Sequence, residues 1–558
     1  IGAGSTQSSH GRSLLGDVVR RAGLCAVWVG EGPVRGTPSP VGALITGKEE
    51  TSCPGRQGGL VVFQEIAPPP FGPTAAVGPL LHSALALRAA PTLVIVLGLT
   101  PSPTMERAGD EVTGLVLATV GPGAALPSTG KLTSVTSDTT RQDGLVSNVD
   151  VAPTILRYFG IPIPSQMEGR PIRATEAPAP FLLHRLELEQ RRTRLPVQFA
   201  ELAFVVLAFL AGAWGLIKLS RAGTLSVRVR SALQSLSIVV VALPVALLAA
   251  GLLPRRSYAW TVPAILLSLG VLALGAERLR RAGGDPLRPF TLLGVVGLVL
   301  MLVDLSFAGP ALRVPLFGGT MFDGVRYYGL PNGFVPMALG SGLLLAGALP
   351  PYGGFVALVT VGLAAGFPSL GADIGGSITL FVAAGLWLVL RSRRPLRILE
   401  LAFVAAVAVV GLGVVLLANR FLPGSPTHAT RFVEQTTGAP AHGFHVIAAR
   451  LAVGARMIRH VPAAVLPLLG FVIILIVVVR RLGSVGAGMA VDARWPAIVI
   501  TVCLAALVAY VVNDTGPAAA DPAFVYAMAG ITYPAMLATR RAGTPPAPPA
   551  RHDARAAP

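Results

Sequence analysis

Charge is scarce in this chain. Asp, Glu, Lys and Arg together make up 13% of the 558 residues, whereas soluble domains carry about 25%. The charge that is present is mostly basic, with 45 Lys and Arg against 27 Asp and Glu and a formal net charge of +18. The basic residues stand at the ends of apolar runs, a pattern typical of membrane topology signals rather than of a nucleic-acid-binding surface. We therefore expect membrane lipids, and no nucleic acid, among the partners.

Cysteine is also rare, with three in the chain. No CxxC pair and no Cys/His spacing of a zinc site is present in the sequence, so it offers no ready-made metal motif. Cys503 lies in an apolar run and is expected to pack inertly. Cys25 and Cys53 fall in the N-terminal region, where a disulfide between them is possible if that region is extracytoplasmic.

Apolar sequence is abundant instead, since hydrophobic residues make up 53% of the chain. From Phe199 to Leu537 the chain carries about eleven apolar runs, each of about 16–22 residues, and a run of this length crosses the hydrocarbon core as a helix. The sequence therefore predicts an all-α polytopic transmembrane bundle of about eleven helices over 199–540. We place the spans at 199–219, 235–253, 258–276, 289–307, 333–349, 352–367, 376–390, 398–418, 461–479, 495–512 and 523–538.

Residues 1–175 have a different pattern, in which short β-like runs alternate with helical ones. Strands are expected at 25–29, 59–63, 91–99 and 115–121, and helices at 14–22, 80–89 and 152–159. Such alternation favours an α/β domain with a largely parallel sheet. The chain opens at Ile1 in what resembles the middle of a domain, so we expect this domain to be N-terminally truncated.

Two flanking segments complete the predicted organisation. Residues 176–198 are expected to form a linker and a juxtamembrane helix, and 541–558 a disordered tail rich in Pro and Ala. If the N-terminal domain is extracytoplasmic, the inner loops hold about nineteen Arg and Lys and the outer loops about nine, as the positive-inside rule requires. The C-terminus is then cytoplasmic.

Polar segments interrupt the apolar runs at three places that this orientation puts on one side. They read LFGGTMFDGVRYYGLPNG, GFPSLGADIGGS and VNDTGPAAAD. Carboxylates beside an Arg and Tyr hydroxyls are able to bind a polar headgroup, a sugar phosphate or a cation. The alternative is ordinary loop chemistry, in which Asp and Asn cap helices and Gly turns the chain. The candidate substrate-binding residues are Asp323, Arg326, Tyr327, Tyr328, Asn332, Asp373, Asn513, Asp514 and Thr515.

One acidic residue, Asp304, lies inside a predicted span. An ionisable group at that depth is costly and suggests a functional role. Its position near the end of the span also permits a simpler interpretation, in which the side chain reaches the interface.

A family resemblance enters at residues 136–172, TSDTTRQDGLVSNVDVAPTILRYFGIPIPSQMEGRPI. The order GLV, DVAPTIL, GIPIP and MEGRP resembles the C-terminal end of alkaline-phosphatase-superfamily domains, which include sulfatases and phosphodiesterases. The resemblance implies that residues 1–175 are the C-terminal part of such an α/β domain. The segments MFDGVRYYGLPNGF, GADIGGS and VNDTG look like those of bacterial membrane proteins that carry an outer domain of this kind. The layout is also similar to ethanolamine-phosphate transferases of glycolipid anchors, by analogy of architecture alone.

Enzymes of that superfamily hold two metal ions with Asp and His around a Ser or Thr nucleophile. Here the strand that would end in an Asp-His pair reads VLGLTPSP, and TRQD stands before GLVSNVD, where a metal-binding His is usual. Asp150 is better interpreted as a helix cap than as a ligand. We therefore expect a non-catalytic relative without a cofactor. Zinc or manganese is expected only if residues upstream of Ile1 supply ligands.

The sequence is thus interpreted as a multi-pass plasma-membrane protein of the cell envelope. Its outer polar residues are predicted to handle a lipid-linked or glycan substrate, as a transporter or an assembly factor. Two alternatives stay open: an active metal-dependent transferase or hydrolase of envelope lipids, and a structural scaffold.

Overall fold

The structure is a computed structural model of the chain, and the chain divides into two compact units, Ile1–Leu186 and Glu187–Pro558. Each unit is described by itself below. The described residues are 18, 25–29, 60–64, 92–97, 115–120, 134–164, 167, 169–175, 181–253, 258–307, 309–313, 316, 327–421, 448, 452, 455–456, 458–459, 465–513 and 515–542.

The first unit contains strands at all four places where the sequence predicts them. These strands are β1 (Cys25–Val29), β2 (Leu60–Gln64), β3 (Thr92–Leu97) and β4 (Leu115–Val120). β1 pairs with β2 in parallel, but β3 pairs with β4 antiparallel. The expectation of a largely parallel sheet is therefore wrong for the described residues, because alternation of element types does not determine strand direction. The helices expected at 14–22 and 80–89 lie outside the described residues, apart from Val18.

A third strand pair closes the segment that carries the family resemblance. β5 (Ser134–Thr136) pairs antiparallel with β6 (Arg173–Thr175), and helix α5 (Val151–Tyr158) lies between them in the chain. α5 buries Ile155 and Leu156 against Met167, so the apolar face of this helix forms the local core. The sequence prediction of a helix at 152–159 is confirmed.

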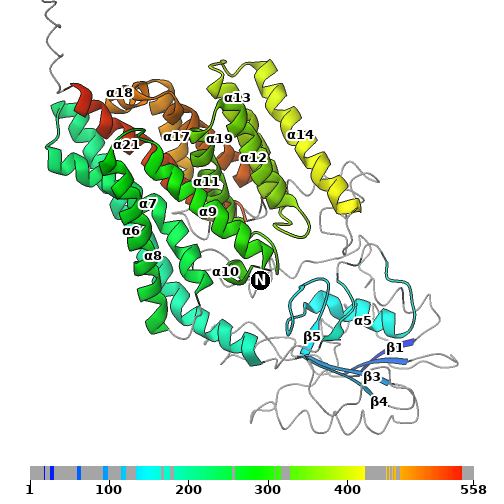
Figure 1. The fold of residues 1–558 in the computed structure, drawn as a ribbon. Helices are drawn as coiled ribbons and strands as arrows, with labels where there is room; N and C mark the ends of the chain where they lie inside the picture. The colour runs from blue at the N-terminus through cyan, green and yellow to red at the C-terminus, as the bar shows by residue number, and fades with distance from the viewer. Residues whose placement is uncertain are drawn as a thin grey trace, which may run out of the picture. The chain divides into compact units, whose positions relative to one another are not determined.

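The second unit is a bundle of helices (Figure 1). α6 is a single helix of 42 residues that joins the predicted juxtamembrane segment to the first span. The long helices are α6 (Phe181–Ala222), α7 (Val227–Leu252), α8 (Tyr258–Ala282), α9 (Arg288–Ser306), α11 (Val335–Ala348), α12 (Pro351–Gly366), α13 (Ile374–Arg391), α14 (Ile398–Phe421), α17 (Val465–Val479), α19 (Arg494–Val512) and α21 (Phe524–Ala542). The shorter helical pieces are α10 (Pro310–Arg313), η3 (Asn332–Phe334), α18 (Gly483–Val491), α20 (Pro517–Ala520) and η5 (Asp521–Ala523).

Seven of these helices are long and apolar enough to cross a membrane, or up to eight if α17 and α18, which are bent by 67° at their junction, form one span. The chain is therefore a multi-pass membrane protein. Each of the eleven predicted spans coincides with a helix, but Asn332–Ala348 and Pro351–Gly366 are shorter than a full span, and α21 is not among the candidates. The expected number of eleven was too high, because an apolar run of about 15 residues is equally suited to burial inside protein.

Helix contacts in the bundle rely on glycine at several crossings. A Cβ on Gly340 of α11 would stand 2.4 Å from the ring of Tyr526, and one on Gly411 of α14 would stand 2.6 Å from the ring of Phe381. Small residues let membrane helices approach closely where apolar lipid gives no driving force for association. The central helices α11 and α13 are buried along most of their length.

Charged side chains form a clamp at one end of the bundle. The guanidinium of Arg494, at the start of α19, donates two hydrogen bonds of 2.5 and 2.8 Å to Asp285 in the α8–α9 loop. It also donates to Asp492, and at 3.4 Å to the carbonyl of Gly347 at the end of α11. Hydrogen bonding to Arg494 holds the pKa of Asp285 below its usual range. The side chain of Arg494 thus connects the loop of Asp285, the residue Asp492 before α19 and the end of α11.

The clamp gives a stability prediction. Arg494→Lys keeps the charge but loses the planar fork that contacts both carboxylates, so we expect the free energy of unfolding in detergent to fall by about 2 kcal/mol. Denaturant or thermal unfolding measures this loss. Arg281→Lys is the matched control, because Arg281 is largely exposed and pairs with Glu277 within its own helix. Equal losses in the two variants would contradict the clamp.

Candidate functional site

Three loops meet at the other end of the same helices. They are 327–334 before α11, 367–373 between α12 and α13, and 513–523 between α19 and α21, and we call them together the polar junction. The amide of Leu330 donates to the carbonyl of Gly371 at 2.7 Å, which joins the first loop to the second. The amide nitrogen of Asn332 donates to the hydroxyl of Thr515 at 3.1 Å, which joins the first loop to the third.

The α12–α13 turn has a backbone that glycine makes possible. A Cβ on Gly371 would stand 2.2 Å from the carbonyl oxygen of Ala365, and one on Gly329 would stand 2.1 Å from the oxygen of Gly371. Ala372 follows with a φ of 48°, a left-handed conformation that costs free energy for a residue with a Cβ. The amides of residues 371–373 donate to carbonyls at and just beyond the end of α12. These three backbone amides therefore have their hydrogen-bond partners within the turn and the end of α12.

Three of the predicted site residues form the floor of the polar junction. Asn332, Asp373 and Asn513 are 7%, 1% and 2% exposed. The side chain of Asn513 packs on Gly375 in the first turn of α13, where a Cβ would meet its Oδ1 at 2.3 Å, and donates to the carbonyl of Ala509 at 3.0 Å. The side chains of Asn332 and Asn513 therefore connect the loops, through Thr515 and Gly375 respectively.

The partly exposed polar groups of the junction are Tyr327, Tyr328 and Thr515, together with Asp521 in η5. The other predicted site residues, Asp323, Arg326 and Asp514, lie outside the described residues. The structure therefore brings together at least one predicted residue from each of the three segments.

Asp521 is a residue that sequence reasoning missed, although it ends the quoted segment VNDTGPAAAD. Its Oδ1 is buried and has no hydrogen-bond partner among the described residues. Burial raises the pKa of Asp521 to about 7. The signal available in the sequence was an acidic residue directly before an apolar helix, which is equally typical of a solvated N-cap.

Asp304 has a structural role in the bundle. It is completely buried near the end of α9, so the interpretation that it reaches the interface is wrong. Its carboxylate accepts hydrogen bonds from the amides of Ala311 and Leu312 at 2.7 and 3.0 Å. These amides belong to α10, and the carboxylate therefore caps a short helix inside the protein.

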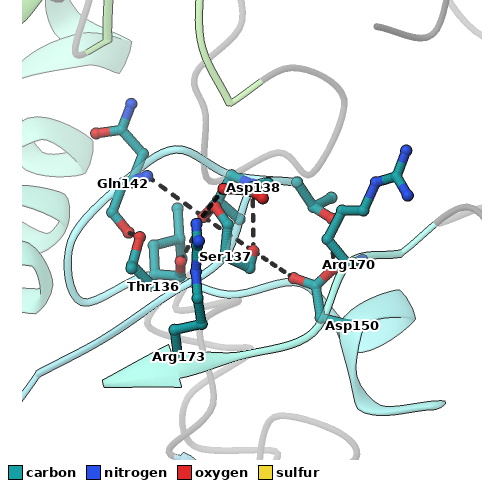
Figure 2. Close-up of polar contacts among 10 residues, drawn as sticks. Thr136, Ser137, Asp138, Gln142, Asp150, Arg170 and Arg173 are labelled. Carbon is teal, nitrogen blue, oxygen red and sulfur yellow. Dashed lines mark hydrogen bonds and ion pairs between the residues drawn. The ribbon is translucent and has the colours of Figure 1, made fainter. Parts of the chain in front are cut away.

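The carboxylate of Asp150 bonds to several separate parts of the segment 136–172 (Figure 2). It accepts from the hydroxyls of Ser137 and Thr139 at 2.6 and 2.5 Å. It also accepts from the amides of Ser147 and Arg170, each at 2.9 Å. It makes no cap bond to the amides of α5, so the predicted cap of that helix is wrong. The bond from the Ser147 amide instead completes the capping box of the 3-10 helix Asn148–Asp150. Both carboxylate oxygens are occupied by protein donors.

Comparison with protein-family models, with curated proteins and with solved structures finds no match for this chain. Among the described residues, no three His, Cys, Asp or Glu side chains gather closely enough to hold a metal ion. The TRQD position, 140–143, lies within those residues, whereas VLGLTPSP falls outside them after residue 97. The chain is therefore identified as a polytopic helical membrane protein, and no family is assigned.

The bonding of Asp150 predicts a large effect of substitution. Asp150→Asn replaces one acceptor by an NH₂ group that faces amide or hydroxyl donors, so we expect the segment 134–175 to lose about 3 kcal/mol of local stability. Hydrogen exchange of the amides of Ser147 and Arg170 in the full chain measures the loss. Asp143→Asn, at an exposed position, is the control. If chelator treatment of the wild type produced the same change, Asp150 would be a metal ligand instead.

The burial of Asp521 predicts a pH dependence. Its folded-state pKa of about 7 lies above the ordinary value, so the folded protein binds more protons than the unfolded chain and stability falls as pH rises from about 4 to 7. We expect the Tm in detergent to fall over this window by about 2–4 °C more in the wild type than in Asp521→Asn. Parallel Tm–pH curves for the two proteins would contradict a buried, proton-binding carboxyl group.

Proposed function

We propose that the polar junction binds the polar headgroup of a lipid-linked or glycan substrate, and that the protein works in its transport or assembly at the membrane face. The convergence of three polar loops, joined by the bonds from Leu330 to Gly371 and from Asn332 to Thr515, carries this proposal. Polar, Gly-rich backbone at the end of a membrane bundle is stable where it is buried in protein or lines a wet cavity.

The chemistry of the junction suits a headgroup that offers hydroxyls and an anion. The hydroxyls of Tyr327, Tyr328 and Thr515 are able both to donate and to accept hydrogen bonds, as sugar recognition requires. Arg326 stands directly before the two tyrosines in the sequence, and a guanidinium binds a phosphate through two parallel hydrogen bonds. The buried amides of Asn332 and Asn513 keep the loops in register without facing the ligand.

We place the polar junction on the outer side of the plasma membrane. Support comes from the opposite end of the helices, where the Arg-rich loops gather: Arg280 and Arg281 end α8, Arg391 ends α13 and Arg494 begins α19. Basic loops favour the cytoplasmic side. In this arrangement the N-terminal unit is extracytoplasmic and the C-terminus is cytoplasmic.

For the N-terminal unit we propose a phosphatase-like domain that does not catalyse a reaction. The carboxylate of Asp150 is used in four hydrogen bonds within the protein, and this supports a residue that maintains the fold. The competing function is a metal-dependent transferase or hydrolase of envelope lipids. Zinc or manganese copurifying with the protein, and a hydrolytic activity lost on chelation, would favour that enzyme.

Headgroup binding is tested with the full chain in detergent. We expect Thr515→Val and the double substitution of Tyr327 and Tyr328 by Phe to weaken binding of a polyprenyl-phosphate-linked sugar or a short-chain anionic phospholipid by at least about tenfold, which is about 1.4 kcal/mol. Microscale thermophoresis or a thermal-shift titration measures the affinity.

Tyr352→Phe is the matched control, because Tyr352 is a largely exposed tyrosine at the start of α12, which lies at the opposite end from the junction. Loss of affinity in Tyr352→Phe alone would place the site elsewhere. Failure of the wild type to bind any of these headgroups would leave the scaffold as the better interpretation.

A further inference from the structure

An apolar groove runs between three helices of the bundle. It is a partly open hollow whose walls come from α6, α7 and α21. The hollow exists because several of the facing residues are small, namely Ala208, Gly212, Ser237 and Ala529. The hydroxyl of Ser237 donates to the carbonyl of Leu233 at 2.9 Å, so this polar atom already has its partner and requires none from an occupant.

The groove lies among membrane-crossing helices, since α6 from Pro196 to Ala222 and α7 are both candidate spans. What surrounds such helices is hydrocarbon. A helix is about 10–12 Å across with its side chains, whereas a single polymethylene chain is much narrower and adapts to a small apolar hollow. The groove therefore matches one hydrocarbon chain of a lipid rather than a partner helix.

Helix α21, which lines the groove, begins directly after the polar junction in the sequence. Phe524, Met528 and Thr532 all line it, and their spacing of four residues puts them on one face of α21. Phe524 is the first residue of α21 and follows η5, which carries Asp521. Two residues therefore separate a carboxyl group of the junction from the first aromatic ring of the groove.

Aromatic rings lie at the end of the groove that follows η5. The ring of Phe524 packs against Phe209 of α6 at 5.5 Å and against Phe471 of α17 at 5.6 Å between centroids. A Cβ on Gly470 would stand 2.4 Å from the same ring, so Phe524 is held firmly on the α17 side. A chain that entered here would pass from polar groups to a mostly apolar path within about one helical turn.

We propose that the α6–α7–α21 groove holds a hydrocarbon chain of the lipid whose headgroup binds at the polar junction. This proposal rests on the proposed function, and it names the substrate class as a lipid rather than a free glycan. The headgroup and the chain are then recognised by adjacent parts of one structure, with η5 between them.

The experiment uses the full chain in vesicles of phosphatidylcholine and phosphatidylglycerol that contain a trace phospholipid with a diazirine on its acyl chain. After irradiation, mass spectrometry measures the labelling of Phe524–Thr532 relative to exposed residues of α8 such as Val271 and Leu274. We expect the groove face of α21 to be labelled at least about threefold more per residue than the exposed face of α8.

Substituted glycines supply the test and its control. A Cβ on Gly212 would stand 3.2 Å from the Thr532 hydroxyl and 3.6 Å from Met528, so Gly212→Leu fills the groove, and we expect it to reduce the labelling of α21 at least about fivefold. Gly270→Leu, on α8, adds the same side chain where nothing lies within 4 Å, and should leave the labelling unchanged. Gly212→Ala, which adds one methyl group, keeps the test valid if the leucine variant fails to fold.

The outcomes separate this inference from the proposed function. Uniform labelling of α21 and α8, or labelling insensitive to Gly212→Leu, overturns the groove even if Thr515→Val still weakens headgroup binding. Groove labelling that persists while headgroup binding is unaffected by Thr515→Val overturns the proposed function instead. Labelling of the exposed face of α8 without any labelling of α21 shows that protein rather than lipid covers the groove, and also overturns it.

Discussion

The organisation of this protein depends on the requirement that polar groups at membrane depth find their partners inside the protein. Asp304 illustrates the constraint most directly, because a carboxylate within a candidate span is stable only when donors are brought to it. The chain supplies them by turning back after α9 into the short helix α10, whose free amides bond to that carboxylate. An acidic residue that suggests function in the sequence is therefore part of the scaffold.

The same constraint separates the two ends of the bundle. At one end, long charged side chains reach across loops, as Arg494 does, and hold the helices through ion pairs. At the other end the loops are joined by backbone and amide hydrogen bonds, and glycine permits the approach of one loop to another. The hydroxyl-bearing residues Tyr327, Tyr328 and Thr515 are partly exposed there, which is why we propose the polar junction, and not the charged clamp, for binding.

In the N-terminal unit, carboxylate chemistry also serves the fold. Asp150 collects four donors from three separated parts of the segment 134–175, and Thr154 extends this network by bonding to the carbonyl of Asp150 and to the amide of Ile172. The residues on which the resemblance rests therefore have a structural use of their own. A resemblance of this kind does not by itself imply a reaction.

Composition and periodicity by themselves determined that this is a multi-pass membrane protein, where its helices lie and where most described strands lie, since hydrocarbon burial and strand formation are local properties of a segment. Strand pairing and the depth of a residue inside the bundle are not local properties. The direction of β4 against β3, the number of full spans, and the burial of Asp304 depend on what each segment packs against. Only the tertiary structure showed that Asn332, Gly375 and Asn513 form one floor, that Asp521 belongs beside them, and that an apolar groove begins where η5 ends. Those relations join residues that lie up to about 180 positions apart in the chain, and helical or strand periodicity carries no information over that separation.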